Sequence, residues 1–326
     1  MQASQLPESA QAFLNVQADR LRRLRPLRRI VFPEGDDPRV QRAARRLDEE
    51  GLLKPVLLSS GDPLCGGDAA KYAQLYFERR RAKGVTPAEA GRIAATPLYR
   101  AALMVAAGDA DGFVGGAVNT TADTVRAALQ SIGLAPSATF VSSAFVMALP
   151  NRAFGHEGIL VFGDCGIVVD PSPVELAEIA IATAQTTRKV VGVEPRVALL
   201  SFSTKGSAQH ASVDKVVEAV RIAHERAPDL SIDGELQGDA ALVEAVARSK
   251  APGSGIAGRA NTLIFPDLTS GNIAYKLVER LAGAASFGPL LQGLAKSAND
   301  LSRGCSAGDI YAVAIITALE SAHASV

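Results

Sequence analysis

The chain has too few cysteines for a disulfide framework. Its 326 residues include three, Cys65, Cys165 and Cys305, which lie far apart and are odd in number. Small secreted domains held by disulfides carry a dense and usually even set. We therefore expect a reducing compartment, the cytoplasm. The first residues also lack a basic region followed by an apolar core, so we expect no signal peptide.

An excess of one charge and long apolar runs are also missing. Lys and Arg number 34, as do Asp and Glu, so the formal net charge is zero. We expect neither nucleic acid nor a membrane surface as a partner. No run approaches the roughly 18 apolar residues of a membrane span, and residues 311–319 are predicted to form a buried helix. The arginine-rich stretch 20–29 is interpreted as a solvated helix face.

Recognisable metal and nucleotide motifs are absent as well. The four histidines are scattered, with no H-x-x-x-H and no C-x-x-C, so we expect no metal site. Residues 253–258 fit G-x-G-x-x-G, but they follow a predicted helix and precede a predicted strand. The dinucleotide fingerprint follows a strand and opens a helix. There is no Walker A sequence either, so no nucleotide site is indicated.

Strand-like and helix-like segments alternate along most of the chain. We predict strands at 29–32, 55–59, 112–114, 139–147, 159–162, 166–169, 197–202, 230–232, 262–265 and 286–291. We predict helices at 37–51, from 86 onward, and at 121–132, 172–189, 212–226, 238–248 and 272–281. This order predicts an α/β fold with largely parallel sheets. The length favours two domains, with a hinge near 150–157.

Polar loops follow several of the predicted strands. Residues 115–121 and 201–207 are examples, and ligands in open α/β sheets bind at the carboxyl ends of strands. The alternative is ordinary loop chemistry and helix N-caps. Arg39 is predicted in a first helical turn, where a cation opposes the helix dipole. It indicates an anionic partner, or instead a salt bridge to Asp36 or Asp37.

The residues richest in reactive groups are Asn299–Asp309. They place a hydroxyl, a guanidinium, a thiol and carboxylates on a loop entering the last predicted helix. Free N–H groups and the helix dipole make such a position suitable for an anionic ligand. The segment 306–309 also fits the capping box S-x-x-[DE], so Asp309 as a cap is an open alternative. Cysteine at Cys305 is more often a buried small hydrophobe than a nucleophile.

Ordered matches along nearly the whole chain resemble the phosphate acetyl/butyryltransferase family, the phosphotransacetylases. The matching segments are Phe32–Gly35 with Arg39, 110–123, Asp164-Cys165, 195–203, 233–241, 261–268, 271–276 and 300–306. Ser297 stands where a proline is common, and Gly163 where an alanine is common. Neither departure removes a reactive group.

The resemblance implies an isocitrate/isopropylmalate dehydrogenase-like fold of two α/β domains with a cleft between them. Domain one would be 1–150 plus 296–326, and domain two, inserted into it, 151–295. The implied reaction is acetyl-CoA plus phosphate giving CoA plus acetyl phosphate, reversibly. CoA is then a substrate, no cofactor is tightly bound, and the family expectation is a homodimer.

The resemblance also implies roles for individual residues. Asp309 takes the proton of the CoA thiol, Ser302 stabilises the developing oxyanion, and Arg303 holds the phosphate. A free Asp and a free thiol differ in pKa by roughly 4.6 units, about 6 kcal/mol against this proton transfer, so a closed and dry cleft is expected. The residues expected to bind CoA or acetyl phosphate are Arg39, Arg126, Asn119, Thr121, Ser142, Ser203, Lys205, Asn272 and Lys276.

Several alternatives stay open from the sequence. The acyl group could be propionyl or butyryl, because a methylene discriminates by only about 1–3 kcal/mol. A nicotinamide-dependent dehydrogenase or a non-catalytic acyl-CoA sensor could share the fold. Within the transferase, Cys305 could carry the acetyl group covalently. We prefer direct transfer because CoA already supplies a thiol and a covalent route needs a second activated one.

Overall fold

The computed structural model describes residues 6–59, 61 and 67–323. Cys65 and the first residues, on which part of the compartment and signal-peptide expectations depends, lie outside the described residues. The chain divides into two compact units: unit 1 is 1–15 plus 142–287, and unit 2 is 16–141 plus 288–326. From the sequence, we expect the divisions at 150/151 and 295/296. Helix α1 (Glu8–Arg22) and strand β9 (Ala285–Gln292) each cross a division.

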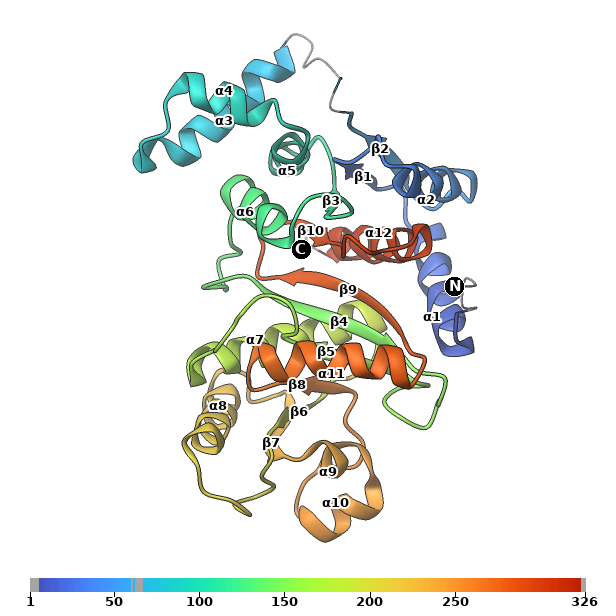
Figure 1. Cartoon of the computed structure of the whole chain (residues 1–326), viewed down its shortest axis with the longest axis vertical. Coiled ribbons are helices and arrows are strands. Elements are labelled where there is room, and N and C mark those ends of the chain that lie inside the picture. Colours follow the sequence, from blue (N-terminus) through green and yellow to red (C-terminus); the bar gives the residue numbers. More distant parts are fainter. Residues whose placement is uncertain (1–5, 60, 62–66, 324–326) are drawn as a thin grey trace. The chain divides into compact units, whose positions relative to one another are not determined.

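Unit 2 contains a mostly parallel sheet in the order β2–β1–β3–β10–β9 (Figure 1). Its remaining strands are β1 (Arg29–Phe32), β2 (Lys54–Leu57), β3 (Gly112–Gly115) and β10 (Ser297–Asp300). β1 pairs in parallel with β2 and β3, β3 pairs in parallel with β10, and β10 pairs antiparallel with β9. The sheet therefore presents the carboxyl ends of four neighbouring strands, β2, β1, β3 and β10, along one edge.

Helices cover this sheet. They are α2 (Pro38–Glu49), α3 (Gly67–Arg80), the 3-10 turn η1 (Arg81–Lys83), α4 (Pro87–Ala94), α5 (Pro97–Ala107), α6 (Thr121–Ser131) and α12 (Ala307–His323). α12 packs against β1, β3, β10 and α2, and its residues 310–319 are all buried. The expected buried helix at 311–319 is confirmed. The apolar faces of α5 and α6 complete a core that includes Val31 and Phe113.

The strands of unit 1 follow the order β4–β5–β8–β6–β7. Its strands are β4 (Ser142–Ala148), β5 (Ile159–Gly163), β6 (Arg196–Leu200), β7 (Ser231–Leu236) and β8 (Thr262–Ile264). Its helices are α7 (Pro173–Thr186) with the π-turn η2 (Thr187–Val191), α8 (Ala211–Arg226), α9 (Gly238–Leu242), α10 (Glu244–Lys250) and α11 (Leu268–Leu281). β4 pairs antiparallel with β5, whereas the pairs β5–β8, β8–β6 and β6–β7 are parallel. The core gathers around Phe145, Met147 and Phe162.

Capping signals in the sequence are confirmed by the structure. The side chains of Thr86 and Ser172 each accept from the backbone N–H three residues on, and Glu89 and Glu175 reciprocate. Proline follows each cap in the first helical position, where its missing N–H costs nothing. These local contacts explain why α4 and α7 begin where the sequence predicted.

The predicted strand at 166–169 is wrong. The backbone N–H groups of Gly166, Ile167 and Val168 donate to the carboxylate of Asp164 at 2.8–3.3 Å. They form a turn around the carboxylate because its oxygens use the amides that a strand would pair with a neighbour. Asp164 is 3% exposed, and Ser143 also donates to it.

Other predictions also differ from the structure. The arginine-rich stretch 20–29, expected on a helix face, is helical only to Arg22, and its last residue lies in β1. The single helix expected at 238–248 is two short helices, α9 and α10, separated at Val243, whose backbone is extended. α5 was not predicted, although it has Pro97 at its start and Gly108 in the left-handed region at its end, which are recognised helix limits. The stretch 299–309, expected to lie on a loop, begins in β10 and ends in α12. Asn299 stabilises that strand by accepting from the N–H of Leu291 and donating to Thr317.

Candidate active site

Three loops leave one edge of the unit 2 sheet. They are residues 33–37 after β1, 116–120 after β3 and 301–306 after β10. β1 is parallel to β3, and β3 is parallel to β10, with Asp300 opposite Gly115. Because these strands run in the same direction, the loops emerge together, where ligands bind in open α/β sheets. Each loop contains, or leads into a helix that contains, residues proposed from the sequence.

The loop after β3 folds around the carboxylate of Glu34, which is 8% exposed. This carboxylate accepts from the four consecutive backbone N–H groups of residues 116–119, at 2.7–3.2 Å. The side-chain amide of Asn119 adds a further hydrogen bond at 2.8 Å. Successive N–H groups of this kind form a concave anion site, and here the chain supplies the anion itself. Glu34 therefore sets the conformation of the loop that carries Asn119.

Arg39 connects the three loops. Its Nε and one terminal nitrogen contact the Asp37 carboxylate at 3.1 and 2.8 Å, and that nitrogen also donates to the Ala117 carbonyl at 2.8 Å. The other terminal nitrogen donates to the carbonyls of Arg303 and Cys305 at 2.8 and 3.0 Å. A guanidinium has five N–H donors, and these five contacts engage all of them. The salt bridge to Asp37 that the sequence left open is present.

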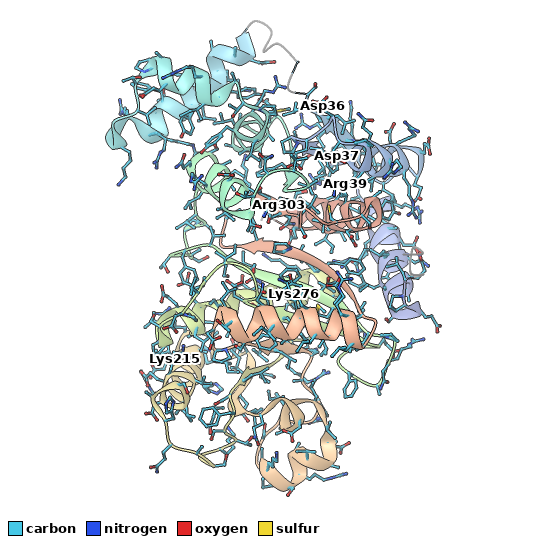
Figure 2. All side chains as sticks on the ribbon, in the orientation of Figure 1. Asp36, Asp37, Arg39, Lys215, Lys276 and Arg303 are labelled. Atoms are coloured by element: carbon cyan, nitrogen blue, oxygen red, sulfur yellow. The ribbon has the colours of Figure 1, made fainter. Side chains whose placement is uncertain are left out.

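Ser302 and Arg303 are exposed on the loop after β10. Within the described part of the chain, the Arg303 guanidinium has no hydrogen-bond or ion-pair partner, and Figure 2 shows it on the same unit as Arg39. The hydroxyl of Ser302 accepts only a long contact, 3.3 Å, from the N–H of Gly304. An exposed and uncommitted guanidinium is suited to bidentate binding of a phosphate.

Asp309 forms the capping box that the sequence predicted at 306–309. Its Oδ2 accepts from the N–H and the hydroxyl of Ser306 at 2.7 and 2.9 Å, and its own N–H donates to the Ser306 hydroxyl at 3.2 Å. Both contacts to the carboxylate use the same oxygen. Oδ1 is uncommitted among the described residues, so the cap leaves it able to accept a proton.

Cys305 belongs to this loop but is buried, with 9% of its surface exposed. Burial raises the pKa of its thiol to about 11, although the nearby Arg39 opposes the shift. The thiolate is the nucleophilic form of cysteine. A pKa this high keeps the group as a thiol near neutral pH.

Asp300, the last residue of β10, is fully buried. Neither of its carboxylate oxygens has a hydrogen-bond partner of good geometry in the described residues. Burial raises the pKa of Asp300 to about 6, and the nearby Thr121 and Thr124 hydroxyls oppose the shift. Oδ1 lies so close to Gly116 that a Cβ there would be 2.2 Å away. Thr121 thus lies near a buried acid at the start of α6.

A cavity of about 320 Å³ opens beside α6 and includes Asn119, Asp123, Arg126 and Tyr99 in its lining. Arg126 pairs with Asp123 at 2.7 Å, three residues away on the same helix, and about half of each side chain is exposed. Exposed ion pairs of this kind contribute little to the free energy of unfolding and are screened by salt. Arg126 is therefore free to exchange Asp123 for an anionic ligand.

Two of the predicted binding residues on unit 1 are committed to internal contacts. The hydroxyl of the buried Ser203 donates to Glu235 at 2.8 Å and accepts from the N–H of Ala208 at 3.1 Å. Lys205 forms an ion pair with Asp233. These contacts organise the loop after β6.

The other predicted residues on unit 1 differ in exposure. Ser142 begins β4 and is 3% exposed. The Asn272 amide donates to the Cys165 carbonyl at 3.1 Å. Lys276 on α11 is exposed, labelled in Figure 2, and its ammonium lies 5.7 Å from the ring centre of Tyr275. The candidates are thus divided between the units: Ser142, Ser203, Lys205, Asn272 and Lys276 on unit 1, the rest on unit 2.

No group of three or more His, Cys, Asp or Glu side chains in the described part of the chain could hold a metal ion. Over the same residues, every helix is too short or too polar to cross a membrane.

A family model described as phosphate acetyl/butaryl transferase matches residues 18–318. The chain belongs to this family. A phosphate acetyltransferase of Paracoccus denitrificans is 49% identical over 302 residues, which cover 90% of this chain and 95% of the relative. The crystal structure of a phosphotransacetylase from Streptococcus pyogenes matches with a TM-score of 0.89 and 43% identity, over 97% of this chain and 99% of that one. The family resemblance drawn from the motifs is confirmed.

More distant structures share only the fold. A protein from Salmonella typhimurium described as a 4-hydroxythreonine-4-phosphate dehydrogenase matches with a TM-score of 0.51 at 14% identity, over 91% of this chain and 99% of that one. The predicted α/β, dehydrogenase-like fold class of the transferase family is confirmed.

Sequence reasoning assigned no role to Glu34 or Asp300, although both lie in segments that carry the family resemblance. A sequence signal was present for each: Glu34 lies two residues after the short strand β1, and Asp300 is the last residue of β10. Buried carboxylates are expected only when they are paired or protonated. Their roles required the tertiary contacts.

Proposed function

We propose that the chain catalyses reversible acetyl transfer between CoA and inorganic phosphate. Its family membership supports an acyltransferase. The observation that carries the proposal is the loop after β10, where Ser302 is exposed, the Arg303 guanidinium is uncommitted, and the Arg303 carbonyl accepts a hydrogen bond from Arg39. Acyl transfer to and from phosphate needs a phosphate clamp and an oxyanion donor on one surface.

The proposed steps start from acetyl phosphate and CoA. The thiol proton passes to Oδ1 of Asp309, and the thiolate sulfur forms a bond to the acetyl carbon. The hydroxyl of Ser302 donates to the oxyanion that develops on the carbonyl oxygen. As the carbonyl reforms, the bond to the phosphate oxygen breaks, and phosphate leaves while bound to Arg303. The proton on Asp309 then passes to the released phosphate or to water, which restores the base. The reverse direction uses the same groups in the opposite order.

Arg126 and Asn119 are proposed to bind a phosphate-bearing part of CoA through the cavity beside α6. Arg126 supplies the charge, and Asn119 retains one side-chain N–H as a donor while the other holds Glu34. Thr121 and the candidates on unit 1, Ser142, Ser203, Lys205, Asn272 and Lys276, stay predictions. Arg39 has no N–H donor left for a ligand.

Direct transfer is proposed in preference to an acetyl-cysteine intermediate. The Cys305 thiol is buried and its pKa lies at about 11, so it is a poor nucleophile near neutral pH. Replacing Cys305 with Ala is expected to leave most of the activity. We further propose, from the family expectation, a homodimer in the cytoplasm with no tightly bound cofactor.

The test is release of thiol from acetyl-CoA, followed with a thiol reagent, with and without inorganic phosphate. Release should depend on phosphate, and acetyl phosphate should accumulate in equal amount. Propionyl-CoA and butyryl-CoA, compared by kcat/KM, decide whether acetyl is the preferred group. Arg303→Ala should lower phosphate-dependent release by at least about 100-fold, whereas Arg42→Ala, an exposed arginine on α2, should not. Release that is independent of phosphate would refute the proposal.

A further inference from the structure

We propose that Arg39 is a positioning residue that holds the Ser302–Arg303 segment in its working geometry rather than a ligand for substrate. The proposal rests on the proposed acetyl transfer for its kinetic consequence, but its structural basis stands apart from it. It begins with the five donor contacts, which reach Asp37, Ala117, Arg303 and Cys305 and leave no N–H for a phosphate.

The guanidinium is itself oriented from its own helix. Asp37 caps α2 by accepting from the Arg39 backbone N–H at 2.7 Å, and its side chain is 13% exposed. The same carboxylate receives two donors from the guanidinium. The hydrogen bonds with Arg39 also hold the pKa of Asp37 below its usual range. The planar fork therefore points its remaining donors in a fixed direction.

Those donors join two loops that carry separate parts of the proposed chemistry. One terminal nitrogen donates to the carbonyl of Ala117. The backbone N–H of the same residue donates to Glu34 at 2.8 Å. The other terminal nitrogen holds the carbonyls of Arg303 and Cys305. Both backbone polar groups of Ala117 are thus hydrogen-bonded. Arg39 connects this fixed position to the loop after β10.

The loop after β10 has few other restraints. Residues 302–304 are exposed, and within the loop the N–H of Cys305 donates to the Ser302 carbonyl at 2.9 Å. That contact bends the loop but does not attach it to the sheet edge. Because a misplacement of about 1 Å can cost about 100-fold in rate, loss of the Arg39 contacts is expected to displace Ser302 and Arg303 enough to slow the reaction.

Arg39→Lys separates positioning from charge. Lysine keeps the positive charge, but its single ammonium cannot make the divergent contacts of the fork. We expect Arg39→Lys to lower kcat/KM for acetyl phosphate by about 10- to 100-fold. If Arg39 acts through Arg303, the same substitution should cost less than about 3-fold in an Arg303→Ala background, since coupled sites are not additive. Equal losses in both backgrounds would overturn the proposal.

A second measurement does not depend on catalysis. Cys305 is 9% exposed within the loop that Arg39 anchors. Labelling of Cys305 by a thiol reagent, followed on its own peptide by mass spectrometry, should be at least about 10-fold faster in Arg39→Lys than in the original chain. Arg42→Lys is the matched control on the same helix and should label at the original rate.

The two readouts separate the possible failures. If the original chain shows no phosphate-dependent thiol release, the proposed function fails, while the labelling experiment still decides whether Arg39 anchors the loop. An unchanged labelling rate in Arg39→Lys, in a chain that remains folded by circular dichroism, would overturn the positioning role whatever the kinetics.

Discussion

Asp309 shows at the scale of one residue how a structural and a chemical role can share a side chain. One carboxylate oxygen receives the cap contacts from Ser306, and the other has no partner in the described residues. The sequence left base and cap as alternatives for Asp309. The geometry makes them compatible, because each role uses a different oxygen.

The two roles can be separated by a pair of variants. Asp309→Asn keeps an oxygen that can accept the cap contacts but removes the base, so we expect kcat to fall by about 100- to 10,000-fold with little loss of stability. Ser306→Ala removes one cap partner and keeps the carboxylate, so it should cost about 1 kcal/mol of unfolding free energy and little activity. Steady-state kinetics and urea unfolding measure both. Near-original turnover of Asp309→Asn would exclude the base.

Asp300 is expected to make stability depend on pH. Burial raises its folded pKa to about 6 from an ordinary 3.8. A carboxyl with a raised folded pKa stabilises the fold while protonated, and that contribution is lost as pH rises from about 4 through 6. Glu34, the nearby acid whose charge adds to the shift, disfavours ionisation of Asp300 in the same direction.

The neutral variant Asp300→Asn should not lose this contribution. The difference in unfolding free energy between the variant and the original chain should therefore shift in favour of the variant, by up to about 3 kcal/mol, between pH 4 and pH 7. Urea unfolding at several pH values measures it, and other titrating groups cancel because both proteins contain them. A difference that stays constant with pH would show that Asp300 does not titrate in this range.

At the scale of elements, the close approach of the loops after β3 and β10 depends on Gly116. Its φ is +100°, and a Cβ there would lie 2.2 Å from Oδ1 of Asp300 and 2.7 Å from the backbone of Leu301. Gly108, at the end of α5, has a similar φ of +83° but nothing within 4 Å of a Cβ. Both glycines therefore have a positive φ, but only Gly116 lacks room for a Cβ.

This pair gives a controlled prediction. Gly108→Ala should cost about 1–2 kcal/mol from the left-handed backbone alone. Gly116→Ala should cost at least about 2 kcal/mol more because it overpacks a buried contact, and it should also lower activity by moving the loop after β10. Urea unfolding of both variants measures the difference. Equal costs would mean that the two loops can separate without penalty.

At the scale of the whole molecule, ligand binding should be visible in stability. A ligand that binds only the folded chain adds about 2.7 kcal/mol of unfolding free energy at a hundred times its Kd. CoA should therefore raise the thermal midpoint in calorimetry, and Arg126→Ala should reduce the rise at the same CoA concentration. No rise at concentrations that saturate the kinetics would contradict CoA as a substrate.

Much of the fold could be predicted from local signals. The capping boxes at Thr86 and Ser172 and most of the strands needed only residues close in sequence. The strand predicted at 166–169 was wrong because the backbone N–H groups there donate to the Asp164 carboxylate. The apolar composition of the segment had indicated that they would pair in a sheet. β10 was missed because Ser-Ala-Asn-Asp has little strand propensity, and its pairing with β3 decides its conformation.

By itself, the sequence determined the family, the α/β class, the caps and the segment Asn299–Asp309 as the centre of the proposed chemistry. Only the tertiary structure decided what those residues touch. Arg39 became an anchor, Glu34 the anion inside a loop and Asp300 a buried acid because parallel pairing of β1, β3 and β10 brings together loops up to 266 residues apart in the chain. Helix caps depend on residues that are close in the sequence. The partners of a charged side chain depend on which strands pair and in what register.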